Sequence, residues 1–217
     1  IARRQRQMCI RDSDETLQSF LASLSSSAAT PGGGAGAALA VAIGAALVAM
    51  TARLSTGRRF RSIEGDMQRV AERCDVIRPE ALGLMEADAQ VYDRVMSAYT
   101  LPKDTEEARE DRAREISLAA EQASRIPLKV AGVACEVIDL AREAASKGNP
   151  NVSSDAGAGA SFARTAIRIC EMNVHANLPV ITDESIRDEL LAALEVASKC
   201  GATADSVVDD ILQSGGA

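Results

Sequence analysis

Large aromatic side chains are almost missing from this sequence of 217 residues: tryptophan is absent, and phenylalanine and tyrosine together make up 2% of the chain. A core without aromatics has to be built from Ala, Val, Leu, Ile and Met, which suits close helix packing better than a β-sandwich. The formal net charge of −7 repels phosphate backbones, and so few aromatics offer little for base stacking. We therefore expect no nucleic-acid partner.

Metal ligands in their usual spacings are missing as well. His175 is the single histidine, and the five cysteines lie far apart without a C-x-x-C pair. No zinc site can be assembled at these spacings, and nothing supports a Ser-His-Asp triad. We therefore expect no zinc site. The odd number of cysteines and the lack of a secretory signal favour reduced thiols in the cytoplasm.

Strand patterns are missing too, because no segment alternates with period two for long, whereas apolar residues recur at helical spacing. We predict an all-α bundle of seven or eight helices, with capping boxes at Asp12 and Asp104 and a kink or short break at Pro79. The expected helices span about residues 15–24, 31–54, 62–98, 104–125, 127–147, 153–175 and 182–201, with a short one closing the chain. Residues 12–217 are interpreted as one domain, and residues 1–11 as a tail or a foreign extension.

What the sequence does have is a long uncharged stretch, "TPGGGAGAALAVAIGAALVAM", which begins at Thr30. By length it could span a membrane, but 13 of the 19 residues after Pro31 are Gly or Ala, which favour membrane insertion only weakly. A phosphate loop would need a lysine after the glycines, and the first lysine is Lys103. Gly32, Gly36 and Gly44 share one face, where another backbone can approach closely. We predict a central buried helix, with its small face against another helix or a second subunit.

Two carboxylates are candidates for chemistry. Asp88 falls on the apolar stripe of helix 62–98, where a carboxylate has to be paired, hydrogen-bonded or neutral. Such an acid either serves an active site or caps or bridges a neighbouring helix. Asp155 follows Ser153 and Ser154 at a helix start, where N-capping is the alternative to a binding role.

Other polar groups could bind a ligand. The turn "GNPNVSSDAGAGA" combines amides, hydroxyls and a carboxylate with glycines, and can present them to one small molecule. Asn173 and Asn177 continue an apolar stripe and are expected to point inward, whereas His175 falls on the polar stripe and is expected to face solvent. The cations that stand out are Arg58, Arg59 and Lys103. They either complement a helix C-terminus or bind an anionic ligand tail.

Four blocks of sequence together resemble a known family. In order they are "TPGGGAGAALAVAIGAALVAM", "ARLSTGRR", "EADAQVYDRVMSAYTLPKDTEEAR" and "GNPNVSSDAGAGASFARTAIRICEMNVHANL". This pattern resembles the cyclodeaminase/cyclohydrolase family, a domain fused to formiminotransferase in animals and free-standing in many bacteria. The likeness covers about residues 14–194.

The resemblance implies an all-helical homodimer that acts on tetrahydrofolate carrying a one-carbon unit, without a metal or a redox cofactor. We expect a cyclodeaminase, which closes 5-formiminotetrahydrofolate to 5,10-methenyltetrahydrofolate and releases ammonia. The alternative is a cyclohydrolase, which interconverts 5,10-methenyl- and 10-formyltetrahydrofolate. A catalytically idle helical dimer that binds folate or a partner protein, and a membrane-associated bundle, are the competing interpretations.

The resemblance also implies roles for the candidate residues. Asp155 is the first candidate for charge stabilisation and proton transfer, and Asp88 is the second. The residues expected to bind substrate are Gly32, Gly33 and Gly34 through their backbone, Asn149, Asn151 and Asn173 at the pterin, Ser154 in the turn, Arg58, Arg59 and Lys103 at the glutamate tail, and His175. At the position of His175 we would expect Arg or Lys in the family, so affinity or pH dependence is expected to differ there.

Overall fold

The computed structural model describes residues 16–214, which form six α-helices and three short 3-10 turns. The helices are α1 (Leu17–Leu24), α2 (Gly33–Arg53), α3 (Glu64–Tyr99), α4 (Glu106–Lys147), α5 (Ser153–Asn177) and α6 (Glu184–Ser214), and the turns are Arg58–Phe60, Pro150–Val152 and Leu178–Val180. This described part of the chain contains no strand, which confirms the all-α prediction.

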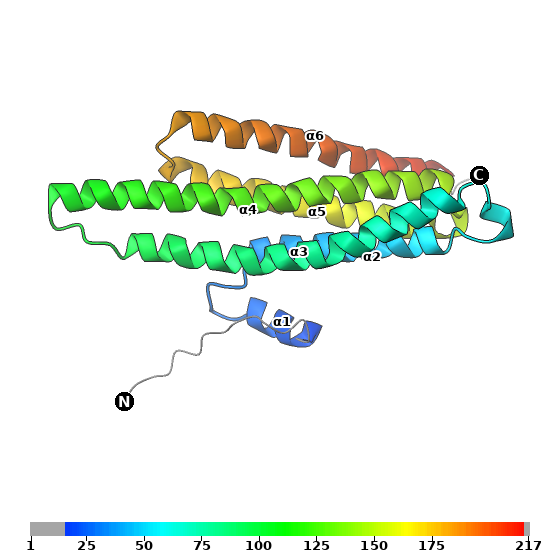
Figure 1. Ribbon diagram of the computed structural model, residues 1–217, viewed down its shortest axis with the longest axis horizontal. Helices are drawn as coiled ribbons and strands as arrows, with labels where there is room; N and C mark the ends of the chain where they lie inside the picture. The colour runs from blue at the N-terminus through cyan, green and yellow to red at the C-terminus, as the bar shows by residue number, and fades with distance from the viewer. Residues whose placement is uncertain (1–15, 215–217) are drawn as a thin grey trace.

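The long helices lie side by side in an elongated bundle (Figure 1). α2 packs between α3 and α5, α4 packs against α3 and α5, and α6 covers the outer side of α4 and α5. α1 lies apart from the bundle, below the amino-terminal end of α2 in this view. The connections alternate between the two ends of the bundle, so sequence neighbours run antiparallel.

The uncharged stretch forms α2, the central helix of the bundle. Its buried side chains include Val41, Ala45 and Val48, which belong to the main hydrophobic core together with residues of α3, α4, α5 and α6. Among the described residues, α2 is the one helix long and apolar enough to cross a membrane, but most of it is buried inside the bundle. The prediction of a buried central helix is therefore confirmed.

The backbone of α5 approaches the backbone of α2 closely at Gly44. A β-carbon built on Gly44 would lie 2.8 Å from the carbonyl oxygen of Gly159 in α5, and one built on Gly159 would lie 2.8 Å from the carbonyl oxygen of Gly44. Real β-carbons essentially never come this close to another atom, so the α2–α5 crossing requires glycine in both helices. The predicted close approach is confirmed at Gly44, whereas a β-carbon on Gly36 would meet no atom within 4 Å.

The number of helices differs from the prediction of seven or eight. α4 runs without interruption through Pro127, and α6 runs through Gly201. The buried face of α4 continues on both sides of Pro127, so its packing outweighs the cost of about 3 kcal/mol for an interior proline. Gly201 does not end a helix; it is buried where a β-carbon would lie 2.9 Å from the Arg164 guanidinium. Pro79 likewise lies within α3, on its exposed side.

The helix starts are close to their predicted positions, but the capping residues differ. Thr105, and not Asp104, caps α4, because its hydroxyl accepts a 3.1 Å hydrogen bond from the Ala108 amide. Thr16 caps α1 by accepting from the Ser19 amide. The capping box predicted at Asp12 and the tail predicted for residues 1–11 lie outside the described residues.

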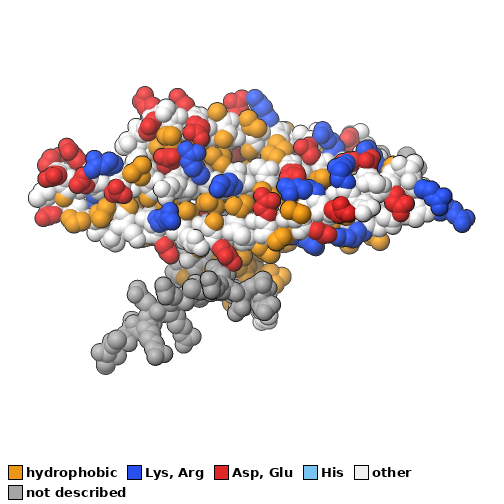
Figure 2. Space-filling model, viewed as in Figure 1, with side chains coloured by type: hydrophobic (Ala, Val, Ile, Leu, Met, Phe, Trp, Pro, Cys, Tyr) orange, Lys and Arg blue, Asp and Glu red, His pale blue; other side chains and the backbone are white. Residues whose placement is uncertain are grey.

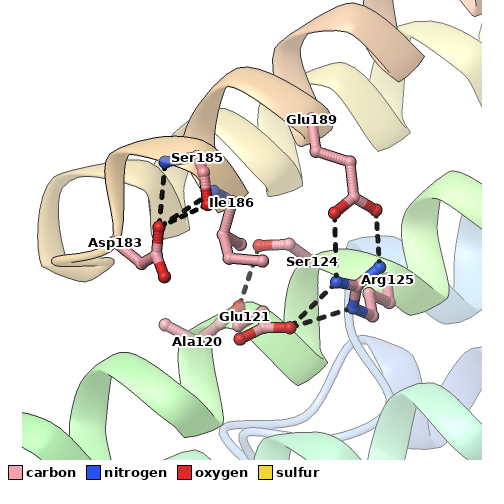
Figure 3. A network of polar contacts seen from close by, with 8 residues as sticks. All are labelled: Ala120, Glu121, Ser124, Arg125, Asp183, Ser185, Ile186 and Glu189. Atoms are coloured by element: carbon pink, nitrogen blue, oxygen red, sulfur yellow. Dashed lines mark hydrogen bonds and ion pairs between the residues drawn. The ribbon is translucent and has the colours of Figure 1, made fainter.

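Charged side chains fasten the helices to one another at the surface, where acidic and basic residues are interspersed (Figure 2). Arg125 of α4 donates to Glu121 on its own helix and to Glu189 of α6, both at 2.9 Å, and so joins the two helices (Figure 3). In the same region the Asp183 carboxylate accepts from the Ser185 and Ile186 amides and caps α6. The Arg125–Glu189 pair therefore links α6 to α4, and the Asp183 contacts fix the start of α6.

Candidate active site at the amino-terminal end of α2

Asp88 of α3 points at the first turn of α2. Its side chain is half-buried, and a β-carbon built on Gly34 would overlap all three atoms of the Asp88 carboxyl group. The carboxyl group therefore occupies the space that a side chain at position 34 would fill. The sequence placed Asp88 on an inward stripe, and the structure confirms that it lies between helices.

The carboxylate of Asp88 meets the unpaired amides at the start of α2. The N-cap residue of this helix is Gly32, which has no side chain to satisfy them. Burial raises the pKa of the Asp88 carboxyl group, and the backbone N–H of Ala35 partly offsets this by donating to the carboxylate. The net result is a pKa above the usual value, as is common for an acid that exchanges protons in catalysis.

α5 completes this cluster from the other side of α2. A β-carbon built on Gly33 would lie 3.9 Å from the amide oxygen of Asn173 and 3.7 Å from Ile169. Asn173 is half-buried, as predicted. Burial raises the pKa of Cys170 to about 12, and the charge of Asp88 adds to this, so Cys170 remains a neutral thiol beside the carboxylate. A carboxylate, an amide side chain and a helix N-terminus therefore converge on the glycine segment.

Another set of predicted residues lies at the opposite end of α2. Arg58 and Arg59 occupy the turn that follows this helix, where both side chains are exposed. Asp155 and Ser154 stand in the first turn of α5, near the same end. α2 has 21 residues and therefore a length of about 30 Å, so within one chain this set does not reach Asp88.

Asn149 has a structural partner at this second end. Its side-chain amide donates to the carbonyl of Leu54 at 3.2 Å, and its side-chain oxygen accepts from the Asn151 amide at 3.1 Å. Its backbone N–H donates to the Ser55 hydroxyl at 2.7 Å. Asn149 thus ties the turn before α5 to the end of α2, while the Asn151 side chain is exposed.

Lys103 and His175 make no described contact with the Asp88 cluster or with the residues at the carboxyl-terminal end of α2. Lys103 lies in the loop between α3 and α4, where its backbone carbonyl accepts a hydrogen bond from Arg109 and its side chain is exposed. His175 stands two residues beyond Asn173 on α5, turned away from the core and exposed, as its place on the polar stripe predicted.

The described residues also form hollows elsewhere on the surface. One of about 430 Å³ lies at the carboxyl-terminal end of α4, lined by Arg142, Ser146, Ser153 and Asp210 among others. Another, of about 410 Å³, lies between α3 and α4 near their connecting loop. Asp88 lines neither of them, so the chemistry of the carboxylate and not the size of a hollow identifies the candidate site.

Sequence reasoning missed Ala35, which acts through its backbone. The only signal is indirect, because a helix that begins at glycine has no capping side chain of its own and leaves its amides for another group. Metal ligands do not cluster in the described part of the chain, where no three His, Cys, Asp or Glu side chains are placed to hold an ion.

Known proteins resemble this chain over most of its length. The model of the family described as formiminotransferase-cyclodeaminase matches residues 16–196. A methenyltetrahydrofolate cyclohydrolase of Methylorubrum extorquens is 38% identical over 200 residues, which cover 91% of this chain and 96% of that protein. The formimidoyltransferase-cyclodeaminase of Mus musculus is 31% identical over 177 residues, 81% of this chain but 33% of that protein.

A solved structure shares the fold. The formiminotetrahydrofolate cyclodeaminase of Thermotoga maritima superimposes with a TM-score of 0.83 at 26% sequence identity, covering 93% of this chain and 97% of that one. The similarity extends along the whole bundle and not only to the glycine-rich segment.

Proposed function

The chain belongs to the formiminotransferase-cyclodeaminase family, and from this premise we propose that it is a methenyltetrahydrofolate cyclohydrolase. The observation that carries the proposal is the relative of this name, which is 38% identical and matches over 96% of its own length. This reverses the preference drawn from the sequence. The cyclodeaminase activity is the second candidate, and the fold shared with the Thermotoga cyclodeaminase favours it.

In both reactions, bonds form and break at one carbon that bridges N5 and N10 of the folate. In the hydrolysis, water adds to the cationic methenyl carbon and loses a proton. The C–N5 bond then breaks as N5 gains a proton and the hydroxyl group loses its own, which leaves 10-formyltetrahydrofolate. A carboxylate beside this carbon stabilises the cation and accepts the proton. In the deamination, N10 attacks the formimino carbon and loses its proton, and the formimino nitrogen gains two protons and leaves as ammonia. Both reactions therefore need one group that exchanges a proton at the same place.

We assign this proton transfer to Asp88 and place Asp155 second. Asp88 is half-buried, its pKa is raised by burial, and a helix N-terminus and Asn173 lie beside it. A carboxylate whose pKa is raised by burial accepts a proton more readily than an exposed aspartate. Asp155 remains a candidate for binding the substrate from the other end of the bundle.

We propose substrate-binding roles for the other candidate residues from their positions in the bundle. Gly32 and Gly33 let the folate approach the backbone, and Asn173 orients the pterin beside Asp88. The groups proposed for the rest of the substrate are Asn149, Asn151, Ser154, Arg58, Arg59, Lys103 and His175. Exposed guanidinium and ammonium groups suit the carboxylates of the glutamate tail.

We propose that two copies of the chain associate through the outer face of α2. This face is apolar and partly exposed along its whole length; it consists of Gly36, Leu39, Ala40, Ile43, Leu47 and Met50. On α5, Phe162 beside Gly44 and Met172 near the site are exposed as well. A two-fold axis perpendicular to α2 would pair the two α2 helices antiparallel. The end of each α2 that lies beside Asp88 would then meet the end of the other that is followed by Arg58 and Arg59. Asp88 of one copy would then face Arg58 and Asp155 of the second copy.

The dimer is tested by its mass. Sedimentation equilibrium is expected to give twice the 22.7 kDa of the chain, and Ile43→Asp is expected to give the monomer. Val76→Asp is the matched control, since Val76 is exposed on α3, away from this face. A monomeric wild type, or a dimer that Ile43→Asp leaves intact, would exclude this interface.

The activity is tested by the ultraviolet absorbance of methenyltetrahydrofolate. Accelerated loss of the band from added methenyltetrahydrofolate is the result expected for the cyclohydrolase. Appearance of the band from formiminotetrahydrofolate, with release of ammonia, would establish the cyclodeaminase instead. No change of absorbance with either substrate from folded protein would refute both activities, and folate binding without turnover would then select the non-catalytic helical dimer.

A further inference from the structure

Gly34 differs from the other glycines of α2 in what surrounds it. A β-carbon on Gly36 would meet nothing within 4 Å, and one on Gly33 would make only ordinary contacts. At Gly34 it would overlap the Asp88 carboxyl group itself. Glycine in a helix costs up to about 1 kcal/mol relative to alanine, so a buried glycine is expected to have a reason. Here the reason is the side chain of another helix.

The absence of a side chain at Gly34 determines the position of the Asp88 carboxylate. The N-cap of α2 is Gly32, which has no side chain, and the Ala35 amide donates to Asp88 of α3. Asp88 therefore caps α2 from outside, in the position that an aspartate at the N-cap would occupy. A methyl group at position 34 would push the carboxyl group off this amide. The Asp88 side chain can rotate to accommodate the methyl group, so the helix itself can persist.

We propose that Gly34 is a positioning residue for the reaction: its missing side chain lets Asp88 lie on the Ala35 amide, and this contact aims the carboxylate at the bridging carbon of the folate. The inference rests on the proposed role of Asp88. It goes further in assigning to Gly34 the geometry of the acid, separate from the backbone contacts of Gly32 and Gly33 with substrate. Misplacement of a catalytic group by about 1 Å can cost about 100-fold in rate.

The test compares Gly34→Ala with Gly83→Ala, a glycine of α3 that is exposed and would meet nothing within 4 Å. We expect Gly34→Ala to lower kcat about 100-fold with KM changed less than about threefold, because the carboxylate and not substrate binding is displaced. Hydrogen exchange of the Ala35 amide is expected to accelerate at least about tenfold in the same variant, through loss of its acceptor. Gly83→Ala is expected to change neither quantity.

Asp88→Asn separates this inference from the proposed function. Its amide oxygen still accepts from Ala35, so exchange is expected to stay slow while activity is lost. If Asp88→Asn is inactive but Gly34→Ala retains wild-type kcat, or if the Ala35 amide stays protected in Gly34→Ala, the positioning role of Gly34 is wrong and the role of Asp88 stands. If Asp88→Asn is fully active, the proposed function of Asp88 fails first.

Discussion

The crossing of α2 and α5 makes the most quantitative prediction for stability. At Gly44 a methyl group would lie 2.8 Å from the Gly159 carbonyl oxygen and 3.4 Å from Val137. The first of these atoms belongs to backbone, so the two helices have to separate to relieve the overlap. Overpacking of a core costs about 1–3 kcal/mol, and a backbone overlap belongs near the upper end. Alanine recovers up to about 1 kcal/mol in helix propensity, so Gly44→Ala is expected to destabilise the fold by about 2 kcal/mol.

Gly132→Ala is the matched control for this change. Gly132 is exposed in the interior of α4, and its β-carbon would meet nothing within 4 Å. The same substitution is therefore expected to stabilise the protein by about 0.5–1 kcal/mol. Urea unfolding at one protein concentration measures both variants. If Gly44→Ala stabilises the protein as much as Gly132→Ala does, the helices do not approach at Gly44 and the argument is refuted.

Two further predictions concern titrating groups. Burial raises the pKa of Glu143, but hydrogen bonds from Arg69 and Lys147 lower it more, so its pKa in the folded protein lies below 4.5. The ionised Glu143 carboxylate therefore stabilises the fold fully above pH 4.5, and this stabilisation is lost as the pH falls through the folded pKa. Urea unfolding of Glu143→Gln is therefore expected to show a smaller loss of stability between about pH 5 and pH 3, and an unchanged slope would contradict this. Burial raises the pKa of Cys74 and of Cys170 to about 12, so an aromatic disulfide reagent at pH 8 should modify these thiols only after unfolding, and rapid labelling of native protein would show that they are accessible.

Much of the fold was predictable because local patterns decide it. The uncharged stretch after Pro31 lacks the lysine of a phosphate loop and consists mostly of Gly and Ala, which favours burial in a helical bundle over a membrane span. The continuity of α4 through Pro127 was not predictable in the same way. Pro127 carries a local signal for a helix start, and only the packing of both halves on one continuous core overrides it.

The candidate site was predictable in part. Asp88 was found because its helical spacing put a carboxylate on an apolar stripe, and Asn173 was found for the same reason. The preference for Asp155 came from the family resemblance, through the match of the "SDAG" segment in its turn. Periodicity does not reveal that this turn and Asp88 lie toward opposite ends of α2, because only the antiparallel order of the helices decides which ends meet. The contribution of Ala35 could not be read from a side chain at all.

We propose above that Asp88 carries the proton transfer of a folate one-carbon reaction. The most direct measurement is the rate of methenyltetrahydrofolate hydrolysis by the wild type and by Asp88→Asn, followed by absorbance, with circular dichroism to verify the fold. Asparagine keeps the size of the side chain and the hydrogen bond from Ala35 but removes the base. We predict a folded variant whose kcat falls by at least about 100-fold, in line with the usual contribution of general acid–base catalysis. Wild-type kcat in the folded variant would contradict proton transfer by Asp88 and make Asp155 the first candidate for this role.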